Sequence, residues 1–351
     1  LGVEVMLKYH RFLMFLGIGL FLVIGFNSEE KSLYSLSGFT MGTTYEIQFV
    51  AASSSEDVPA IKGQIAALLQ RLDREVFSTY SPRSELTALN EAPVGVLFNG
   101  SDDLIKVLKL SEQIRQTTGG AFDITISPLV NLWGFGSQSE ELVNKIPSQA
   151  DIADAKAKMG AESIVIYEDR SAILKAKDIQ IDLSGIAKGY SVDKIASLLD
   201  SYDLDSYFIE VGGEIKLKGF KPGYEEWVPA IEKPSEGQLE IYQLLSSQGK
   251  GFSLAGSGDY RNYFEVGGVR YSHEIDPRTG NPVSHDLAAA FVISKSAAEA
   301  DALATAFMVL GLEESEPIIQ QAGIPAFLVL RVGENQFENF VSSYFSPYLL
   351  N

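Results

Sequence analysis

The sequence predicts an α+β fold built as one folded unit, and three observations support this prediction. The chain has 351 residues, 46% of them hydrophobic, which is enough to bury one large core or two fused lobes. Helical and strand patterns are interleaved, yet several strands follow one another through short hairpin-like links, which favours α+β over a doubly wound parallel sheet. The sequence shows neither an internal repeat nor a low-complexity linker after residue 55.

The composition excludes several classes of function. The 46 acidic residues outnumber the 28 basic ones, so the formal net charge is −18. Nucleic acids are held mainly by clustered lysines and arginines, and we therefore expect no nucleic-acid partner. An anionic ligand would need positive charge that is supplied locally. The sequence contains no cysteine, which excludes disulfides, thiolate catalysis and zinc–sulfur sites.

An uncharged and strongly apolar stretch runs from Phe12 to Phe26, after Lys8 and Arg11 and before two glutamates. This pattern is typical of a secretory signal, since the stretch is short for a membrane span of about 20 residues. A buried core helix is the alternative. We expect residues 1–27 to be a signal peptide or an uncleaved N-terminal anchor, because no small-x-small cleavage site stands out. The protein would then be exported, and either periplasmic or membrane-anchored on the outer face of the cytoplasmic membrane, with residues 28–351 as its folded domain.

The first half of this domain alternates between strand and helix patterns. Residues 45–50 alternate in hydrophobicity as a strand does, and apolar residues recur at helical spacing over residues 61–76. Residues 78–90 are predicted to form a loop. A helix with a serine N-cap is predicted over residues 101–118, and the two glycines that follow would end it. A capping-box pattern of a serine and an aspartate predicts another helix over residues 148–160.

Strand patterns dominate the second half of the domain. Two helices interrupt them, one over residues 185–199 and an alanine-rich one over residues 297–310. The predicted strands span residues 163–167, 173–183, 207–211, 214–217, 227–232, 269–275, 287–294 and 326–331.

Asp301 and Thr305 lie four residues apart in the alanine-rich helix, so their side chains share one face. Both side chains offer hard oxygen ligands. Magnesium binds such oxygens and keeps open positions for phosphate and water, so the pair fits a magnesium ion that bridges to a diphosphate. A purely structural role is the alternative for an aspartate and a threonine one helical turn apart.

Residues 182–190 (DLSGIAKGY) lie where a strand is predicted to run into a helix. A helix N-terminus offers free backbone N–H groups and a favourable dipole for an anion. Lys188 supplies positive charge in an acidic chain, and Asp182 can accept hydrogen bonds from a ring or a ribose. The alternative is a tight turn that its glycines permit, with a solvated lysine.

His273 is one of three histidines in the sequence, and another of them lies in the predicted signal. An imidazole is suited to removing a proton from a hydroxyl near neutral pH. The residue precedes a turn of ordinary proline and glycine chemistry, so a surface histidine at a strand end is the alternative. Aromatic side chains such as Tyr80 and Phe122 offer area for stacking on a flat ring, with core packing as their alternative role.

These segments, taken together, resemble the FAD:protein FMN transferases, also described as ApbE-type flavin transferases. The resemblance runs from about residue 36 to residue 330, and its motifs occur in the order of the family. The motifs are residues 39–43 (FTMGT), residues 78–80 with Ser84, Glu85 and Asn90, and residues 119–136, 182–193, 211–214, 257–260, 273–280 and 301–305.

The resemblance implies a fold, an activity and a set of site residues. The implied fold is α+β with a tunnelling-fold-like core, a second lobe and mixed sheets flanked by helices, and the flavin lies between the lobes. The implied activity transfers FMN from FAD to a threonine or serine hydroxyl of another protein as a phosphoester, with magnesium, and releases AMP. The implied contacts with FAD are Met41, Tyr80, Ala121, Phe122, Asp123, Asp182, Lys188 and Ile275; Asp301, Thr305 and the carbonyl of Gly185 would hold magnesium, and His273 would be the base.

Two positions depart from the family pattern. Glu274 stands where the family usually has an aliphatic residue, and the lipobox cysteine common in exported members is absent from the sequence. The second departure removes lipid anchoring.

The resemblance also implies a protein partner. The implied acceptor is an exported or membrane redox subunit, such as those of the sodium-pumping NADH:quinone reductase or related electron-transfer complexes, with its hydroxyl in an Asp-Gly/Ala-x-Ser-Gly-Ala-Thr-like stretch. An uncleaved anchor would add an association with the inner membrane. Two alternative functions stay open: a magnesium-dependent FAD pyrophosphatase that releases FMN and AMP, and a non-catalytic exported flavin-binding protein.

Overall fold

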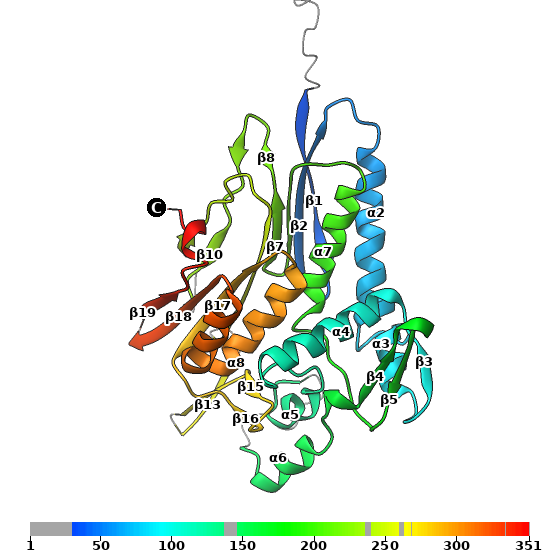
Figure 1. Cartoon of the computed structure of the whole chain (residues 1–351), viewed down its shortest axis with the longest axis vertical. Coiled ribbons are helices and arrows are strands. Elements are labelled where there is room, and N and C mark those ends of the chain that lie inside the picture. Colours follow the sequence, from blue (N-terminus) through cyan, green and yellow to red (C-terminus); the bar gives the residue numbers. More distant parts are fainter. Residues whose placement is uncertain are drawn as a thin grey trace, which may run out of the picture.

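An eight-stranded antiparallel sheet forms the centre of the fold (Figure 1). The computed structural model describes residues 30–136, 146–235, 240–259, 263–267, 269–333 and 335–350, so the predicted signal at residues 1–27 lies outside the described residues. The strand order is β1-β2-β6-β7-β12-β17-β18-β19, and each pair of neighbours is antiparallel. The strands span Lys31–Thr40 (β1), Thr43–Ala52 (β2), Tyr207–Val211 (β6), Glu214–Lys218 (β7), Phe252–Gly258 (β12), Leu287–Ser294 (β17), Ala326–Gly333 (β18) and Gln336–Val341 (β19).

The first two strands form a long hairpin and pair along their full lengths. Its turn consists of Met41 and Gly42, which have φ angles of 49° and 76°. β2 lies inside the sheet and buries Ile47 and Phe49 completely, whereas β1 is an edge strand whose residues alternate between exposed and half-buried. The sequence predicts the first strand only from residue 45 and misses β1, because the serines of this edge strand resemble a polar linker.

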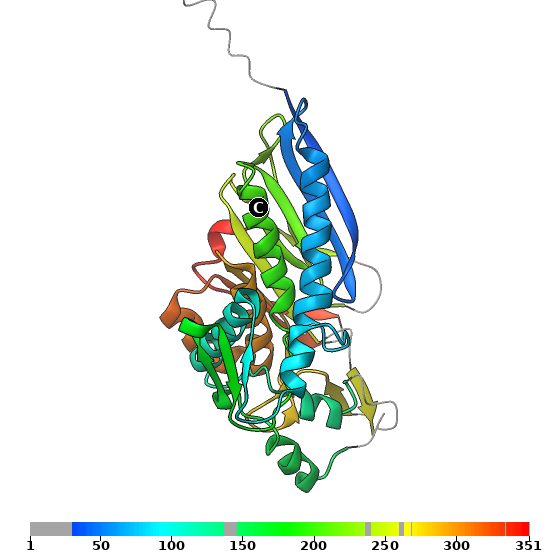
Figure 2. The same cartoon turned by 90° about the vertical axis from the view of Figure 1, so that its right-hand side faces the viewer.

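Helices α2, α7 and α8 cover one face of the sheet. α2 spans Val58–Arg71 and continues as a π-helical turn over Leu72–Phe77, α7 spans Ala187–Asp200, and α8 spans Ala297–Ala322. Figure 2 shows α2 and α7 side by side, and their apolar faces pack against β2 and β6. The opposite face of the sheet buries Trp227 together with residues from the C-terminal segment.

α7 and α8 cap each other at their N-terminal ends. Asp193 on α7 accepts hydrogen bonds from Oγ of Ser296 (2.7 Å) and from the backbone nitrogen of Ala298 (3.1 Å) at the start of α8. In return, Asp301 on α8 accepts a hydrogen bond from the backbone nitrogen of Gly189 (3.0 Å) in the first turn of α7. The first N–H groups of a helix have no partner inside that helix, so both carboxylates satisfy donors that would otherwise be buried without a partner.

Several of the smaller elements, among them α5, α6, β15 and β16, lie below α7 and α8 in the view of Figure 1. α4 packs against α8, and a three-stranded sheet in the order β3-β5-β4 lies beside it. The bounds here are Glu85–Glu91 (α3), Leu97–Asn99 (β3), Asp102–Thr117 (α4), Ser127–Leu132 (α5), Gln149–Lys156 (α6), Ile164–Tyr167 (β4), Ala172–Lys175 (β5), Tyr263–Val266 (β13), Val269–Ser272 (β14), Ile275–Asp276 (β15) and Asn281–Pro282 (β16). Four short strands span Phe220–Lys221 (β8), Glu225–Glu226 (β9), Ala230–Glu232 (β10) and Ile241–Leu244 (β11), and short 3₁₀ turns span Ala161–Ser163, Glu168–Arg170 and Ser346–Tyr348.

The α+β prediction is confirmed, and several element predictions match closely. The predicted strands 207–211 and 287–294 coincide with β6 and β17. Ser148 and Asp151 form the predicted capping box at the start of α6. Along the part of the chain that the structure describes, no helix is both long and apolar enough to cross a membrane.

Several predicted bounds are wrong. The predicted helix 148–160 ends at Lys156, and the predicted strand 227–232 begins only at Ala230. The predicted loop 78–90 contains α3, because Ser84 accepts the capping hydrogen bond of a short helix. The predicted strand 173–183 ends with β5 at Lys175, and the strand 269–275 is interrupted at residues 273–274. The predicted helix 297–310, by contrast, is confirmed: the backbone leaves helical geometry at Gly311, where φ is 68° and ψ is −177°, and a second helical segment follows within α8 up to Ala322.

Candidate active site

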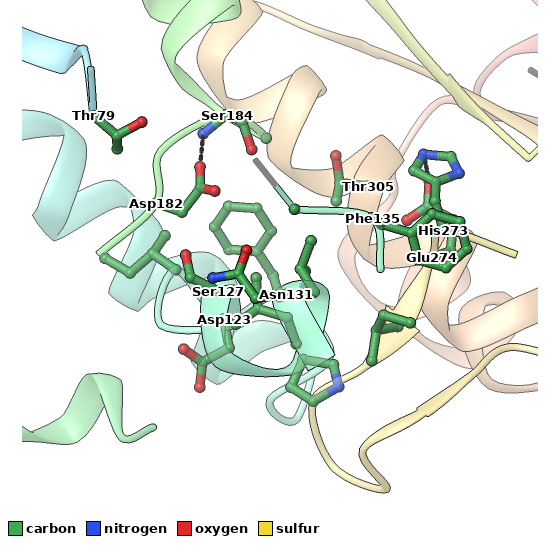
Figure 3. Close-up of a pocket in the computed structure, with 18 of the residues that line it drawn as sticks. Thr79, Asp123, Ser127, Asn131, Phe135, Asp182, Ser184, His273, Glu274 and Thr305 are labelled. Carbon is green, nitrogen blue, oxygen red and sulfur yellow. Dashed lines mark hydrogen bonds and ion pairs between the residues drawn. The ribbon is translucent and has the colours of Figure 1, made fainter. Parts of the chain in front are cut away.

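A cavity of about 1450 Å³ lies where the large sheet, α8 and the smaller elements meet. Its walls come from segments that are far apart in the sequence, chiefly residues 79–91, 121–136, 180–188 and 273–277 together with one face of α8. Figure 3 shows Asp182 and Asp123 toward one side of the cavity and His273 toward the other. The predicted site residues that line it are Tyr80, Ala121, Phe122, Asp123, Asp182, Gly185, Lys188, His273, Ile275, Asp301 and Thr305.

The three predicted magnesium ligands lie on one wall of the cavity. A β-carbon added to Gly185 would stand 3.4 Å from Oγ1 of Thr305, so the backbone of this glycine passes beside the threonine hydroxyl. Asp301 lies one turn earlier on α8 and is 4% exposed. Its position is fixed by the hydrogen bond from Gly189 that joins α7 to α8.

Lys188 and Glu214 form a charge cluster with Asp301, in which the two carboxylates are buried and the lysine side chain is 25% exposed. The Nζ atom of Lys188 lies 3.4 Å from Oε1 of Glu214 and 3.8 Å from Oδ1 of Asp301. Gly212 makes room for the lysine, because a β-carbon there would lie 3.1 Å from Lys188 Cδ and 2.7 Å from Thr43 Cγ2. Glu214 is not among the site residues that the sequence predicts. The available signal was an acidic residue directly after two glycines, at the start of a strand whose neighbours are apolar.

The pKa values of this cluster reflect two carboxyl groups that share one cation. Burial and then the charge of Asp301 raise the pKa of Glu214 well above its usual range. Burial also raises the pKa of Asp301, although Lys188 acts in the opposite direction. Burial lowers the pKa of Lys188, but the two carboxylates outweigh this effect and raise it. The cluster therefore favours an additional positive charge nearby.

The same cluster fits a divalent cation. Oε2 of Glu214 is buried and has no hydrogen-bond partner among the described residues. Carboxylate, hydroxyl and carbonyl oxygens are the hard ligands that magnesium prefers. Over the described ranges, no group of three or more histidine, cysteine, aspartate or glutamate side chains is placed to hold a metal ion. A cation here would therefore depend on the uncharged oxygens of Thr305 and Gly185 as well as on carboxylates.

Asp182 is held in place by the segment that leads into α7. Its Oδ1 accepts a hydrogen bond from the backbone nitrogen of Ser184 at 2.8 Å, as Figure 3 shows. The side chain of Asn90 pairs with both backbone groups of Ile181, at 2.9 and 2.8 Å. The buried Lys175 in turn donates to the carbonyl of Asn90 at 2.6 Å. The backbone N–H and C=O groups of this segment thus form hydrogen bonds with side chains and not with a neighbouring strand. This explains why the predicted strand 173–183 ends early.

The turn after α4 presents residues 121–123 to the cavity. Oδ1 of Asp123 accepts hydrogen bonds from the backbone nitrogen and the hydroxyl of Thr125, at 2.7 and 2.6 Å. Burial raises the pKa of Asp123, although these two hydrogen bonds act in the opposite direction. Phe122 is 5% exposed, and its ring faces Gly185 on the wall that also carries Thr305.

The other predicted FAD contacts differ in how they are placed. Tyr80 lines the cavity and is 76% exposed, so its ring has room to cover a bound ligand. Ile275 is buried at the start of β15. Met41 is not one of the residues that line the cavity. It lies in the β1–β2 turn, where its sulfur accepts a hydrogen bond from Oγ of Ser191 at 3.5 Å.

His273 occupies the interruption between β14 and β15. Its side chain is 29% exposed and lines the cavity. Nε2 lies 3.5 Å from Oε1 of Glu274, and the ring meets Phe135 edge-on with centroids 6.2 Å apart. This contact with Glu274 is not predicted by the sequence. The imidazole therefore faces the cavity with a carboxylate beside it.

The arrangement suits transfer of a phosphoryl group from an extended ligand. The cavity exceeds the roughly 300–1,000 Å³ of ordinary small-molecule pockets, so it can hold a dinucleotide and part of a second substrate. The start of α7, Lys188 and a cation beside Asp301 would meet the charge of a diphosphate. An imidazole in the same cavity can take a proton from an attacking hydroxyl.

Comparisons with known proteins agree with this chemistry. The model of the ApbE family matches residues 41–328. The FAD:protein FMN transferase of Vibrio cholerae is 36% identical over 330 residues, which cover 94% of this chain and 96% of that protein. The enzyme of the same name from Haemophilus influenzae is 35% identical over 323 residues, covering 90% and 92%. The crystal structure of the Pseudomonas stutzeri flavinyl transferase ApbE, apo form, is 36% identical and matches with a TM-score of 0.81, covering 91% of this chain and 97% of that one.

Proposed function

The chain belongs to the ApbE family, and from this premise we propose that it transfers FMN from FAD to a hydroxyl group of a target protein. The observation that supports this function best is the meeting of two groups in one cavity: the charge cluster of Lys188, Glu214 and Asp301, and the imidazole of His273. The first group suits a diphosphate with its cation, and the second suits an attacking hydroxyl.

FAD would lie across the cavity with its diphosphate at the start of α7. The ammonium group of Lys188 would bind the phosphate oxygens, and the dipole at the start of that helix would favour their negative charge. Asp182 would accept hydrogen bonds from the flavin ring or the ribose. Phe122 and the exposed ring of Tyr80 would provide aromatic surface for stacking.

We propose magnesium as the cation that this reaction uses. Asp301, Thr305 and the carbonyl of Gly185 would hold it, with Glu214 beside them. When bound, magnesium would neutralise the diphosphate and stabilise the charge that develops during phosphoryl transfer. Lys188 supplies a further positive charge from the chain itself.

His273 would act as the general base. Its imidazole takes the proton of the acceptor hydroxyl, whose oxygen then forms a bond to the phosphorus on the FMN side of FAD. The bond between that phosphorus and the bridging oxygen breaks, and AMP leaves with the bridging oxygen. FMN stays on the acceptor as a phosphoester, and the proton on His273 returns to solvent.

We further propose that the acceptor is an exported or membrane redox subunit, such as those of the sodium-pumping NADH:quinone reductase. Its threonine or serine would lie in an Asp-Gly/Ala-x-Ser-Gly-Ala-Thr-like segment. The partial exposure of His273 supports this proposal, because a segment of another protein must reach the base from solvent.

Incubation of the full chain with FAD, magnesium and a purified acceptor domain that carries this segment tests the function. Flavin fluorescence of the acceptor in a denaturing gel, lost when a chelator is added, would support FMN transfer. An unmodified acceptor with FMN and AMP in solution would favour a magnesium-dependent FAD pyrophosphatase. Unchanged FAD would contradict both activities.

We also propose that residues 1–27 direct the protein out of the cytoplasm, either as a cleaved signal or as a retained anchor. The support is the uncharged apolar stretch from Phe12 to Phe26, which follows basic residues. Cell fractionation, with protease added to spheroplasts, tests this proposal. Protection of the protein inside spheroplasts would contradict it.

A further inference from the structure

Arg278 joins the turn between β15 and β16 to helix α8, beside which β15 lies (Figure 1). Its Nε and Nη2 atoms donate to the carboxylate of Asp276 at 3.0 and 2.9 Å, which forms one fork. Nη1 and Nη2 donate to the carboxylate of Glu314 on α8 at 2.5 and 3.2 Å, which forms a second fork. Forked bonds between an arginine and a carboxylate are strong and fix the geometry of both partners. Arg278 therefore links the hairpin that follows the proposed base to the helix that carries the proposed magnesium-binding side chains.

The backbone around Arg278 is anchored to two further helices. Nε1 of the buried Trp133, at the end of α5, donates to the carbonyl of Gly280 at 2.9 Å. Nζ of Lys156, at the end of α6, donates to the carbonyl of Arg278 itself. The nitrogen of Gly280 donates to the carbonyl of Asp276 at 2.7 Å and closes the turn. A displacement of Arg278 would therefore displace the hairpin as a whole and not one side chain alone.

This hairpin is continuous with the segment that bears the proposed base. The carbonyl of Glu274 accepts a hydrogen bond from the nitrogen of Val283 at 2.9 Å, so the far strand of the hairpin holds the residue next to the base. Residues 273–275 and 277 line the cavity, and Arg278 is not one of the lining residues. Arg278 therefore acts on the reaction through the segment that it holds, and not by contact with FAD.

Glu314 stands on a firm support at the other end of this link. It lies in the second helical segment of α8, after the break at Gly311. Phe307 before the break and Ile319 after it belong to one hydrophobic core and are fully buried, so both segments of α8 are held in the same place. The side chain of Glu314 itself is 54% exposed. Its loss should therefore have little effect on the fold, because exposed ion pairs contribute little to stability.

We propose that Arg278 is a positioning residue, which holds the segment of the proposed base His273 at a fixed place relative to α8. The base and the cation act at the same phosphorus but come from two different segments. A displacement of about 1 Å in such an arrangement can cost about 100-fold in rate. The pair of Arg278 and Glu314 joins these two segments directly. The proposal rests on the proposed function, because it takes His273 as the base and α8 as the helix of the cation site.

The kinetic test uses the full chain and removes the link at its exposed end. Glu314→Ala abolishes the tie to α8 and leaves the pair of Arg278 with the buried Asp276 intact. Glu316→Ala is the matched control, because it removes another exposed glutamate from the same helix. Glu314→Ala should lower kcat for FMN transfer about tenfold, through a displacement of the base of less than 1 Å. The KM for FAD should stay unchanged. Glu316→Ala should keep the kcat of the wild type, and the two variants should have the same melting temperature.

Two double variants show whether the link acts through the base. In the background of His273→Gln, the further change Glu314→Ala should cost no additional residual activity. Arg278→Met keeps the Cγ atom that faces Gly120, and its combination with Glu314→Ala should be no slower than Arg278→Met alone. A Glu314→Ala variant with the kcat of Glu316→Ala, or an additive loss in either double variant, would overturn the proposal.

Hydrogen exchange of the free protein tests the link without any enzymatic activity. The amides of Gly280 and Val283 form the hydrogen bonds that close the hairpin. In Glu314→Ala these amides should exchange about tenfold faster than in Glu316→Ala, because the hairpin opens more often without its tie to α8. Equal exchange in the two variants would overturn the proposal. A wild type that modifies no acceptor would defeat the proposed function, whereas the exchange at Gly280 and Val283 would still decide whether Arg278 and Glu314 hold the hairpin.

Discussion

The backbone nitrogen of Gly189 lies 3.0 Å from Oδ2 of Asp301, so the proposed magnesium ligand on α8 also caps the first turn of α7. Only glycine permits this approach. A β-carbon at position 189 would lie 2.3 Å from the carbonyl oxygen of Ala297 and 2.8 Å from Cα of Ala298. Asp301 is therefore held by two helices before any ligand binds, which is the preorganisation that a metal site requires.

Replacement of Gly189 by alanine should push α7 away from α8 and shift Asp301. The added methyl group overpacks a buried contact, so the free energy of unfolding should fall by about 2 kcal/mol. Magnesium affinity, measured by isothermal titration calorimetry in the presence of FAD, should fall as well. Gly63→Ala is the matched control, because that glycine lies in α2 with nothing within 4 Å of an added β-carbon. This control should stabilise the protein by about 0.5–1 kcal/mol, and equal effects of the two substitutions would contradict the close-contact explanation.

Lys188→Met should reveal the excess negative charge of the cluster. Without the ammonium group, Glu214 and Asp301 remain buried side by side, and the free energy of unfolding should fall by about 3 kcal/mol. Magnesium should restore part of this loss, so it should raise the melting temperature more in Lys188→Met than in the wild type.

A double variant controls this interpretation. Lys188→Met combined with Glu214→Gln removes one carboxylate, and it should be more stable than Lys188→Met alone when no metal is present. A double variant that is less stable than the single one would argue against repulsion between the two carboxylates.

Asp103 on α4 should make stability depend on pH in the acid range. It accepts hydrogen bonds from Arg71 at 2.5 Å and from the hydroxyl of Tyr190 at 2.7 Å, and it pairs with Lys194 at 3.1 Å. Burial raises the pKa of Asp103, but these three partners outweigh that effect and hold the pKa at about 2. The folded pKa is thus below the unfolded value of 3.8. The stability that the ionised group contributes is present above pH 3.8 and is lost as the pH falls through about 2.

Asp103→Asn should therefore destabilise the protein at neutral pH by about 2 kcal/mol, and the difference from the wild type should shrink as the pH falls through this window. Urea denaturation at several pH values measures this difference. A difference that stays constant with pH would show that the carboxylate charge contributes nothing.

Local patterns in the sequence predicted the parts of the fold that local interactions determine. β6 follows the two-residue period of a half-buried strand, and β17 is a short apolar run of the kind that forms a strand buried on both faces. The capping box at Ser148 involves groups only three residues apart. Asp301 and Thr305 lie on one face of α8 because they are four residues apart in a helix, so helical geometry alone predicts this arrangement.

Contacts between distant segments account for what the sequence did not reveal. The segment after Lys175 leaves the sheet because Asn90, 91 residues away from Ile181 in the sequence, satisfies its backbone. Glu214 joins Lys188 only because the turn at Gly212 brings β7 beside α7. No periodic pattern within a single segment encodes either contact.

Mass spectrometry of the acceptor domain tests the central claim most directly. The full chain, FAD and magnesium are incubated with the domain and, in parallel, with a matched domain whose acceptor threonine is replaced by alanine. We predict one FMN on the threonine, none on the alanine variant, and none when a chelator is added or Asp301→Ala replaces the wild type. An unmodified threonine, with FMN and AMP free in solution, would contradict FMN transfer to protein.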